Sequence, residues 1–172
     1  TTHRIGFRDV SNSTNERSMV AAALPTGAVC HNKCPTIRPY EINPERGDLA
    51  KETLHDMYER IFTDEELFLA LGFLNSIPFD YIVRTKFDTT MSVNTIEESQ
   101  IPRLTKGDDW FEYISSRAAR LNAYGDEFTE IRQNIGDVEP VTEKQERRRL
   151  QSELDAAAFH AYGLERDQTE FV

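Results

Sequence analysis

The sequence predicts an α+β protein in which a small antiparallel β-sheet, made of an N-terminal hairpin and further strands, packs with a helix-rich C-terminal half. Three observations predict this class. Ile5 and Phe7 alternate with less apolar neighbours, which is the two-residue period of a strand. A continuous apolar run covers residues 19–24. Apolar residues then recur at helical spacing over residues 150–162.

The N-terminal segments are expected to pair as a hairpin. Residues 11–15 read Ser-Asn-Ser-Thr-Asn, and short polar side chains that bond their own backbone suit a tight reversal. Pro25 and Gly27 stop the apolar run at residues 19–24, which fits a strand buried on both faces or a short buried helix. We take the strand as the working interpretation and expect a third strand near residues 28–31.

The middle of the chain is expected to hold a loop and then helices. Residues 38–47 contain two prolines and a glycine, which favours a loop, and residues 48–62 show an amphipathic helical stripe. Thr63 and Glu66 form a capping box, because each side chain can satisfy an orphan backbone donor at a helix start. Pro78 lacks an N–H, so the helix should kink or restart there.

The C-terminal half should be mainly helical. Residues 88–100 predict a loop or a short strand, because they are rich in Thr, Ser, Asn and β-branched side chains. Residues 108–135 predict a helix that Gly125 divides. Gly163 follows the last apolar stripe and is placed to end that helix in a left-handed cap.

The charge of the chain bears on its partners. The net charge is −10, with 30 acidic and 20 basic residues, and this balance argues against nonspecific nucleic-acid binding. A salt-adapted source is an equal alternative to an ordinary acidic protein. In molar salt, charges more than roughly 3 Å apart are screened, so an acidic surface would serve solubility and net charge would steer little.

The chain is expected to be soluble and cytoplasmic, with no membrane partner. It has no apolar run of 18 or more residues and no basic-then-apolar start. The chain begins with Thr1 instead of Met and ends in an apolar pair, so we expect it to be a piece of a longer protein.

The cysteines do not predict a metal site. Cys30 and Cys34 flank His31 in the stretch VCHNKCP. A tetrahedral zinc site needs four ligands, and this stretch supplies at most three at an unusual spacing. We interpret the two residues as small half-buried thiols in a reduced compartment.

No catalytic signature is present. The sequence contains no GxSxG, HExxH, GxxxxGK[ST] or GxGxxG pattern, and its four histidines are scattered. We therefore expect no catalytic residue and no cofactor in these 172 residues.

Cations and amides gather beside the predicted turns. Such side chains reach phosphates and the hydrogen-bonding edges of bases, with Arg favoured for guanine and Asn for adenine. Each of them is as well suited to bracing a turn through an ion pair or hydrogen bond, so both interpretations stay open. The candidate DNA-binding residues are Arg8, Asn15, Arg17, Asn32, Lys33, Arg84, Lys86 and Asn94.

Several sequence blocks, taken in order, resemble the C-terminal region of large adenine-specific DNA methyltransferases. The blocks are RIGFRDV, STNERSMVAAALP, HNKCP, FLNSIPFDYIVRTKF, SQIPRL and ELDAAAFHAYGLERDQTEFV. The family comprises the single-chain restriction-modification enzymes of the Eco57I-like class (type IIG) and related phage-defence methyltransferases. The resemblance covers most of the chain from Arg4 to Val172.

The resemblance implies a target-recognition-like domain over residues 1–107 and a helical extension over residues 108–172. It implies double-stranded DNA as the partner, together with an N-terminal methyltransferase core that lies upstream. That core would hold S-adenosylmethionine and the catalytic motif and would flip the target adenine out of the duplex. Base-reading residues are expected within residues 38–46 or 89–94, because recurring blocks are better suited to holding the fold or touching phosphate.

Two alternatives remain open. The chain could be a protein-interaction module that packs on another domain or subunit through the apolar stripes of residues 48–87 and 143–163. A small hydrolase or zinc protein is the third hypothesis.

Overall fold

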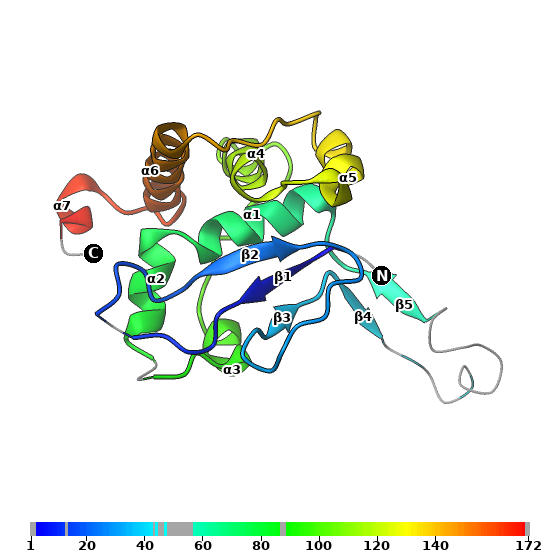
Figure 1. Cartoon of the computed structure of the whole chain (residues 1–172). Coiled ribbons are helices and arrows are strands. Elements are labelled where there is room, and N and C mark those ends of the chain that lie inside the picture. Colours follow the sequence, from blue (N-terminus) through cyan, green and yellow to red (C-terminus); the bar gives the residue numbers. More distant parts are fainter. Residues whose placement is uncertain are drawn as a thin grey trace.

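The α+β class is confirmed by the computed structural model, which describes residues 3–12, 14–42, 44, 47, 57–86 and 89–170. Two small antiparallel sheets lie beside a layer of helices (Figure 1). Helix α1 (Asp64–Leu74) runs through the middle of the molecule, with the larger sheet on one side (Figure 1). Helices α4 (Phe111–Asn122), α5 (Thr129–Asn134) and α6 (Lys144–Ala161) lie on the other side.

The larger sheet has the strand order β2-β1-β3. Strand β1 (Arg4–Phe7) lies in the centre and pairs antiparallel with β2 (Ala21–Leu24) and β3 (Thr36–Ile37). The predicted hairpin is therefore confirmed. Ile5 and Phe7 are almost completely buried, since a period of two places both on the face that α1 covers.

Two expectations about the strands are wrong. The run at residues 19–24 is not buried on both faces, because Val20 is 43% exposed and β2 alternates instead. Residues 28–31 form no strand. Gly27 turns the chain at φ 79°, and the partner that extends the sheet is β3, farther along the chain.

The second sheet was not expected. Strand β4 (Tyr40–Ile42) lies in the segment predicted as a loop, and it pairs with β5 (Tyr58–Arg60). Because β5 occupies the end of the expected helix over residues 48–62, that expectation is wrong there. Residues 48–56 lie outside the described residues.

Local helix signals were confirmed. Helix α1 (Asp64–Leu74) begins with the predicted capping box, in which the Glu66 N–H donates to Thr63 Oγ1 at 3.2 Å and the Thr63 N–H to Glu66 Oε2 at 2.8 Å. Helix α2 (Ile77–Arg84) has Pro78 in its first turn and is bent by 61° from α1.

The remaining helices complete the shell. A short helix α3 (Val93–Glu97) lies within the segment 88–100, where a loop or short strand was expected, and the described residues on either side of it, 89–92 and 98–100, form a loop. Gly125, at φ 78°, divides α4 (Phe111–Asn122) from the 3₁₀ turn η2 (Asp126–Phe128) and α5 (Thr129–Asn134). Helix α6 (Lys144–Ala161) is followed by Gly163 at φ 70°, as predicted, and then by α7 (Arg166–Thr169).

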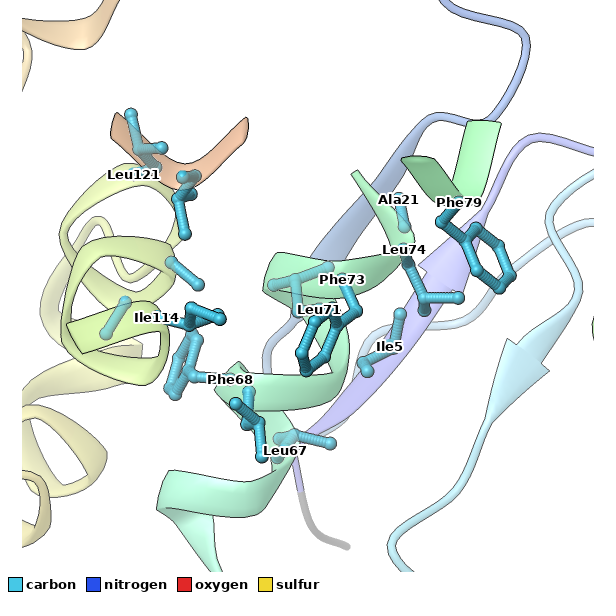
Figure 2. Packing of buried hydrophobic residues seen from close by; sticks show 14 of the residues in the cluster. Ile5, Ala21, Leu67, Phe68, Leu71, Phe73, Leu74, Phe79, Ile114 and Leu121 are labelled. Carbon is cyan, nitrogen blue, oxygen red and sulfur yellow. The ribbon is translucent and has the colours of Figure 1, made fainter. Parts of the chain in front are cut away.

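The core surrounds α1. Figure 2 shows side chains of α1 lying between Ile114 of α4 on one side and Ile5 of β1 on the other. Gly72 allows α4 to approach closely, since a Cβ there would lie 2.6 Å from Ile114 Cγ2. One buried cluster draws on both parts of the chain, residues 1–107 and 108–172.

No single helix in the described ranges is long and apolar enough to cross a membrane. Helices α1 and α2 together pass the same test of length and composition, but only as a bent pair.

Candidate nucleic-acid interface

The turn after β1 is held by an arginine that bonds two distant segments. Arg17 forms a two-pronged ion pair with Asp155 of α6, with Nη2–Oδ2 at 2.6 Å and Nη1–Oδ1 at 3.1 Å. Its Nη1 also donates to the carbonyl of Asn75 at 2.6 Å, and Asp155 accepts the backbone N–H of Ile77 at the start of α2.

A second carboxylate holds the same turn from α2. Asp80 accepts the backbone N–H groups of Ser18 and Met19 at 2.8 and 2.6 Å, and it pairs with Arg84 Nε at 2.6 Å. The other end of the Arg84 guanidinium donates to the carbonyl oxygens of Asn15 and Glu16, both at 2.8 Å. Since Asp80 is buried, these donors satisfy a charge that would otherwise be costly.

An asparagine continues this network to the sheet edge. The Asn75 side chain accepts from the N–H of Ala21 at 2.9 Å and donates to its carbonyl at 3.0 Å, as a neighbouring strand would. We call the set Arg17, Asn75, Asp80, Arg84 and Asp155 the polar clamp. Two of the predicted DNA-binding residues, Arg17 and Arg84, thus have partners within the chain.

Five other predicted residues gather at one end of the larger sheet. The Asp9 N–H donates to the carbonyl of Lys33, the Met91 N–H donates to the carbonyl of Asp9, and Val10 bridges Thr90. These bonds bring the end of β1 beside the turn before β3 and the start of α3 (Figure 1). We call Arg8, Asn32, Lys33, Lys86 and Asn94 the sheet-end surface, and all five are exposed.

The eighth predicted residue lies apart from that surface. Asn15 is half-buried in the turn that the polar clamp holds. The two segments in which we expected base-reading residues also differ. Residues 89–94 border the sheet-end surface, whereas Tyr40–Ile42 form β4 on the second sheet and residues 43, 45 and 46 lie outside the described residues.

Each cation of the sheet-end surface is exposed and has a partner within the chain. Lys33 Nζ lies 3.3 Å from Asp9 Oδ2, and the Lys33 side chain is 59% exposed. Arg8 makes long hydrogen bonds of 3.3 Å to Ser11 Oγ and 3.4 Å to the Arg17 carbonyl. Lys86 Nζ donates to the carbonyl of Glu98 at 2.5 Å. The bonds of Arg8 are long and its side chain is exposed, so its cation remains available to a ligand. Lys33 is exposed as well, and it also balances the charge of the buried Asp9.

The charge is segregated along the chain, which our reading of the sequence missed. No Asp or Glu occurs between Glu16 and Glu41, although 30 of the 172 residues are acidic. This acid-free stretch includes β2, β3 and the connection between them. The only carboxylate within β1 and the two residues after it is Asp9, which is buried. Acidic side chains are concentrated instead in the rest of the chain.

The two cysteines lie in this stretch, on the face of the sheet opposite α1. Both are half-buried, and Cys34 Sγ packs against Gly6. Burial, followed by a hydrogen bond with Cys30, raises the pKa of the Cys34 thiol. Within the described ranges, no group of three or more His, Cys, Asp or Glu side chains is arranged to hold a metal ion.

Two cavities lie elsewhere. One of about 370 Å³ opens at the start of α1, where the Asp64 carboxylate accepts hydrogen bonds from both Arg60 and Asn134. The other, of about 420 Å³, is largely apolar and lies between α1 and residues 101–105. The charged residues of the first are satisfied by their neighbours, so neither cavity displays an evident catalytic arrangement.

Comparison with protein-family models, with curated proteins and with solved structures finds no match to this chain.

Proposed function

We propose that this chain is the DNA target-recognition module of an N6-adenine DNA methyltransferase, and that its sheet-end surface contacts double-stranded DNA. The observation that carries the proposal is the sheet-end surface itself, where exposed cations and amides from three segments meet, with Asn32 and Lys33 supplied by the acid-free stretch. Phosphate contacts need such cations, and base edges accept such amides.

The polar clamp gives the blocks that resemble the methyltransferases a common role in this fold. Its residues come from three of the blocks that resemble the methyltransferases: Arg17 from the second block, Asn75, Asp80 and Arg84 from the fourth, and Asp155 from the last. In the folded chain these blocks hold one another. The three blocks therefore form one structural framework in the folded chain.

The parent enzyme would supply what this chain lacks. Its methyltransferase core would bind S-adenosylmethionine and act on the flipped adenine, while this module would grip the duplex and set the register. The residues described here would carry out no methyl transfer themselves.

A binding experiment tests the proposal. The wild-type chain and the triple variant Arg8→Ala, Lys33→Ala, Lys86→Ala are titrated with a fluorescent 24-base-pair duplex at several salt concentrations. Each lost phosphate contact should reduce the slope of log affinity against log salt by about 1. The triple variant should therefore bind more weakly, with a slope smaller by about 3.

A matched control uses exposed cations that lie outside the sheet-end surface. The variant Lys106→Ala, Arg149→Ala, Arg166→Ala removes the same charge, and all three residues are exposed. It should keep the wild-type slope. Equal losses in the two triple variants would mean that net charge alone governs binding, and no binding by the wild-type chain would refute the proposal.

Packing on another protein domain is a second candidate function. The apolar cavity between α1 and residues 101–105 favours it, because Ile61 at its rim is 45% exposed. An Ile61→Glu variant should then bind less of an apolar fluorescent dye than wild type. Equal dye fluorescence would remove this candidate.

A further inference from the structure

One apolar side chain projects almost fully into solvent. Val29, in the connection between β2 and β3, is 96% exposed, whereas the other large exposed hydrophobic residues of the described ranges are 37–52% exposed. Exposed hydrophobic residues are ordinary when they stand singly. Val29 differs because hydrogen bonds hold the backbone on both sides of it and because the exposed residues that follow it are polar.

The backbone before Val29 is tied to β1. Gly27 takes the positive φ of 79° that a tight turn needs, and the Ala28 N–H donates to the carbonyl of Pro25 at 3.4 Å. The Arg4 guanidinium donates to the carbonyl of Ala28. The residue directly before Val29 is thus bonded to a side chain of the central strand.

The backbone after Val29 is tied to the same strand. The Cys34 N–H donates to the carbonyl of His31 at 2.9 Å, which closes a second turn. The carbonyl of Lys33 accepts from Asp9 at 3.3 Å, and that of Pro35 accepts from Phe7 at 3.0 Å. Val29 is therefore presented by a supported loop.

The neighbours of Val29 favour DNA over a protein partner. His31, Asn32 and Lys33 are exposed, and the whole connection lies in the acid-free stretch. It offers donors and a cation around one aliphatic side chain and holds no carboxylate of its own, and the carboxylate that Lys33 pairs with, Asp9, is buried. In the major groove, Lys pairs with phosphate or guanine, Asn with adenine, and an apolar side chain with the methyl group of thymine.

We infer that Val29 enters the major groove of duplex DNA and contacts the 5-methyl group of thymine, with Lys33 on a neighbouring phosphate and Asn32 beside the base edges. This inference rests on the proposed function and names a base contact outside the two segments that the sequence indicated. Val29 would distinguish thymine from other bases, and the contact of Lys33 with phosphate would fix how far the loop enters the groove.

The test compares thymine with uracil, which lacks that methyl group. A 24-base-pair duplex pool is selected from random sequence for binding to the wild-type chain and is then prepared with either thymidine or deoxyuridine. Burying one methyl group should make the thymine pool bind about fourfold tighter. Val29→Ala should bind both pools equally, with the affinity that wild type has for the uracil pool.

The matched control is Ile61→Ala, which shortens an exposed aliphatic side chain between β5 and α1, outside both segments in which base-reading residues were expected. It should keep the fourfold preference for thymine. Circular dichroism should show the wild-type fold for both variants, because neither side chain is part of the buried cluster.

The outcomes separate this inference from the proposed function. DNA binding without a thymine preference, or with the same preference in Val29→Ala, would overturn the role of Val29 and leave the module a DNA binder. Failure of the wild-type chain to bind either the unselected or the selected duplexes would overturn both.

Discussion

Arg17 donates two hydrogen bonds to the carboxylate of Asp155, although 138 positions separate the two residues in the sequence. The pair joins the turn after the first strand to the last long helix. Asp155 is only 7% exposed, so its charge depends on this partner.

Replacing Arg17 by Ala should destabilise the fold strongly. The change leaves the Asp155 carboxylate buried without its cation, and the loss of one partner of such a pair costs about 3 kcal/mol. Urea unfolding followed by fluorescence measures the free energy of unfolding. Arg149→Ala is the control, because its side chain is 69% exposed and its loss should cost less than about 1 kcal/mol. Equal stability of the two variants would show that Arg17 is no brace.

Removing the helix cap at Thr63 should cost about 1 kcal/mol. Thr63→Ala deletes the oxygen that accepts the Glu66 N–H, and it leaves that donor at the start of α1 to water. Thr63→Ser retains the oxygen and should stay within a few tenths of a kcal/mol of wild type. Thermal unfolding of both variants compares them, and a serine variant as unstable as the alanine variant would contradict the capping role.

A methyl group at Gly72 should disturb the contact between α1 and α4. In Gly72→Ala the new Cβ would lie 2.6 Å from Ile114 Cγ2 and 3.4 Å from Ala118 Cβ, and overpacking of this kind costs about 1–3 kcal/mol.

Gly47→Ala provides the matched control, since a Cβ at that position meets no atom within 4 Å. Chemical denaturation of the two variants should rank Gly72→Ala as much the less stable. Wild-type stability in Gly72→Ala would mean that α1 and α4 can separate without loss.

Glu153 should contribute stability that is lost in acid. Hydrogen bonds from Arg117 at 2.7 Å and from Arg149 at 2.9 Å lower the pKa of this carboxyl group below its ordinary value of 4.5. Because the pKa is lower in the folded than in the unfolded chain, the contribution is present above about pH 4.5 and disappears as the pH falls through the lowered pKa.

The free energy of unfolding of Glu153→Gln should therefore lie below that of wild type at pH 7, and the difference should shrink towards pH 3. Urea titrations across this range measure it. Gln133→Ala, at an exposed position on α5, removes no carboxyl group and should show no such pH dependence. A constant difference for Glu153→Gln would contradict an electrostatic origin.

Features set by neighbouring residues could be predicted from the sequence. The capping box at Thr63, the bend before Pro78 and the end of α6 at Gly163 each depend on a few consecutive residues. The third strand could not be placed, because pairing with β1 selects Thr36–Ile37 from across a turn-rich connection.

The candidate interface could be predicted only in part. In the sequence, nothing distinguishes Arg17 and Arg84 from arginines that are free to bind a ligand. Only the folded chain shows that they form ion pairs with Asp155 and Asp80. Arg8 and Lys33 look the same as those arginines in the sequence, but their side chains are exposed in the folded chain. The acid-free stretch can be found in the sequence, but only the structure shows that it forms two of the three strands of the larger sheet.

The central position of α1 has a consequence for cooperativity. Since α1 is sandwiched between strands from one part of the chain and helices from the other, neither side has a complete core alone. A polypeptide ending at residue 107 would expose the side of α1 that α4 covers and would remove the partner of Arg17. The described protein should accordingly melt in a single transition, with heat absorption that cannot be divided between an N-terminal and a C-terminal unit.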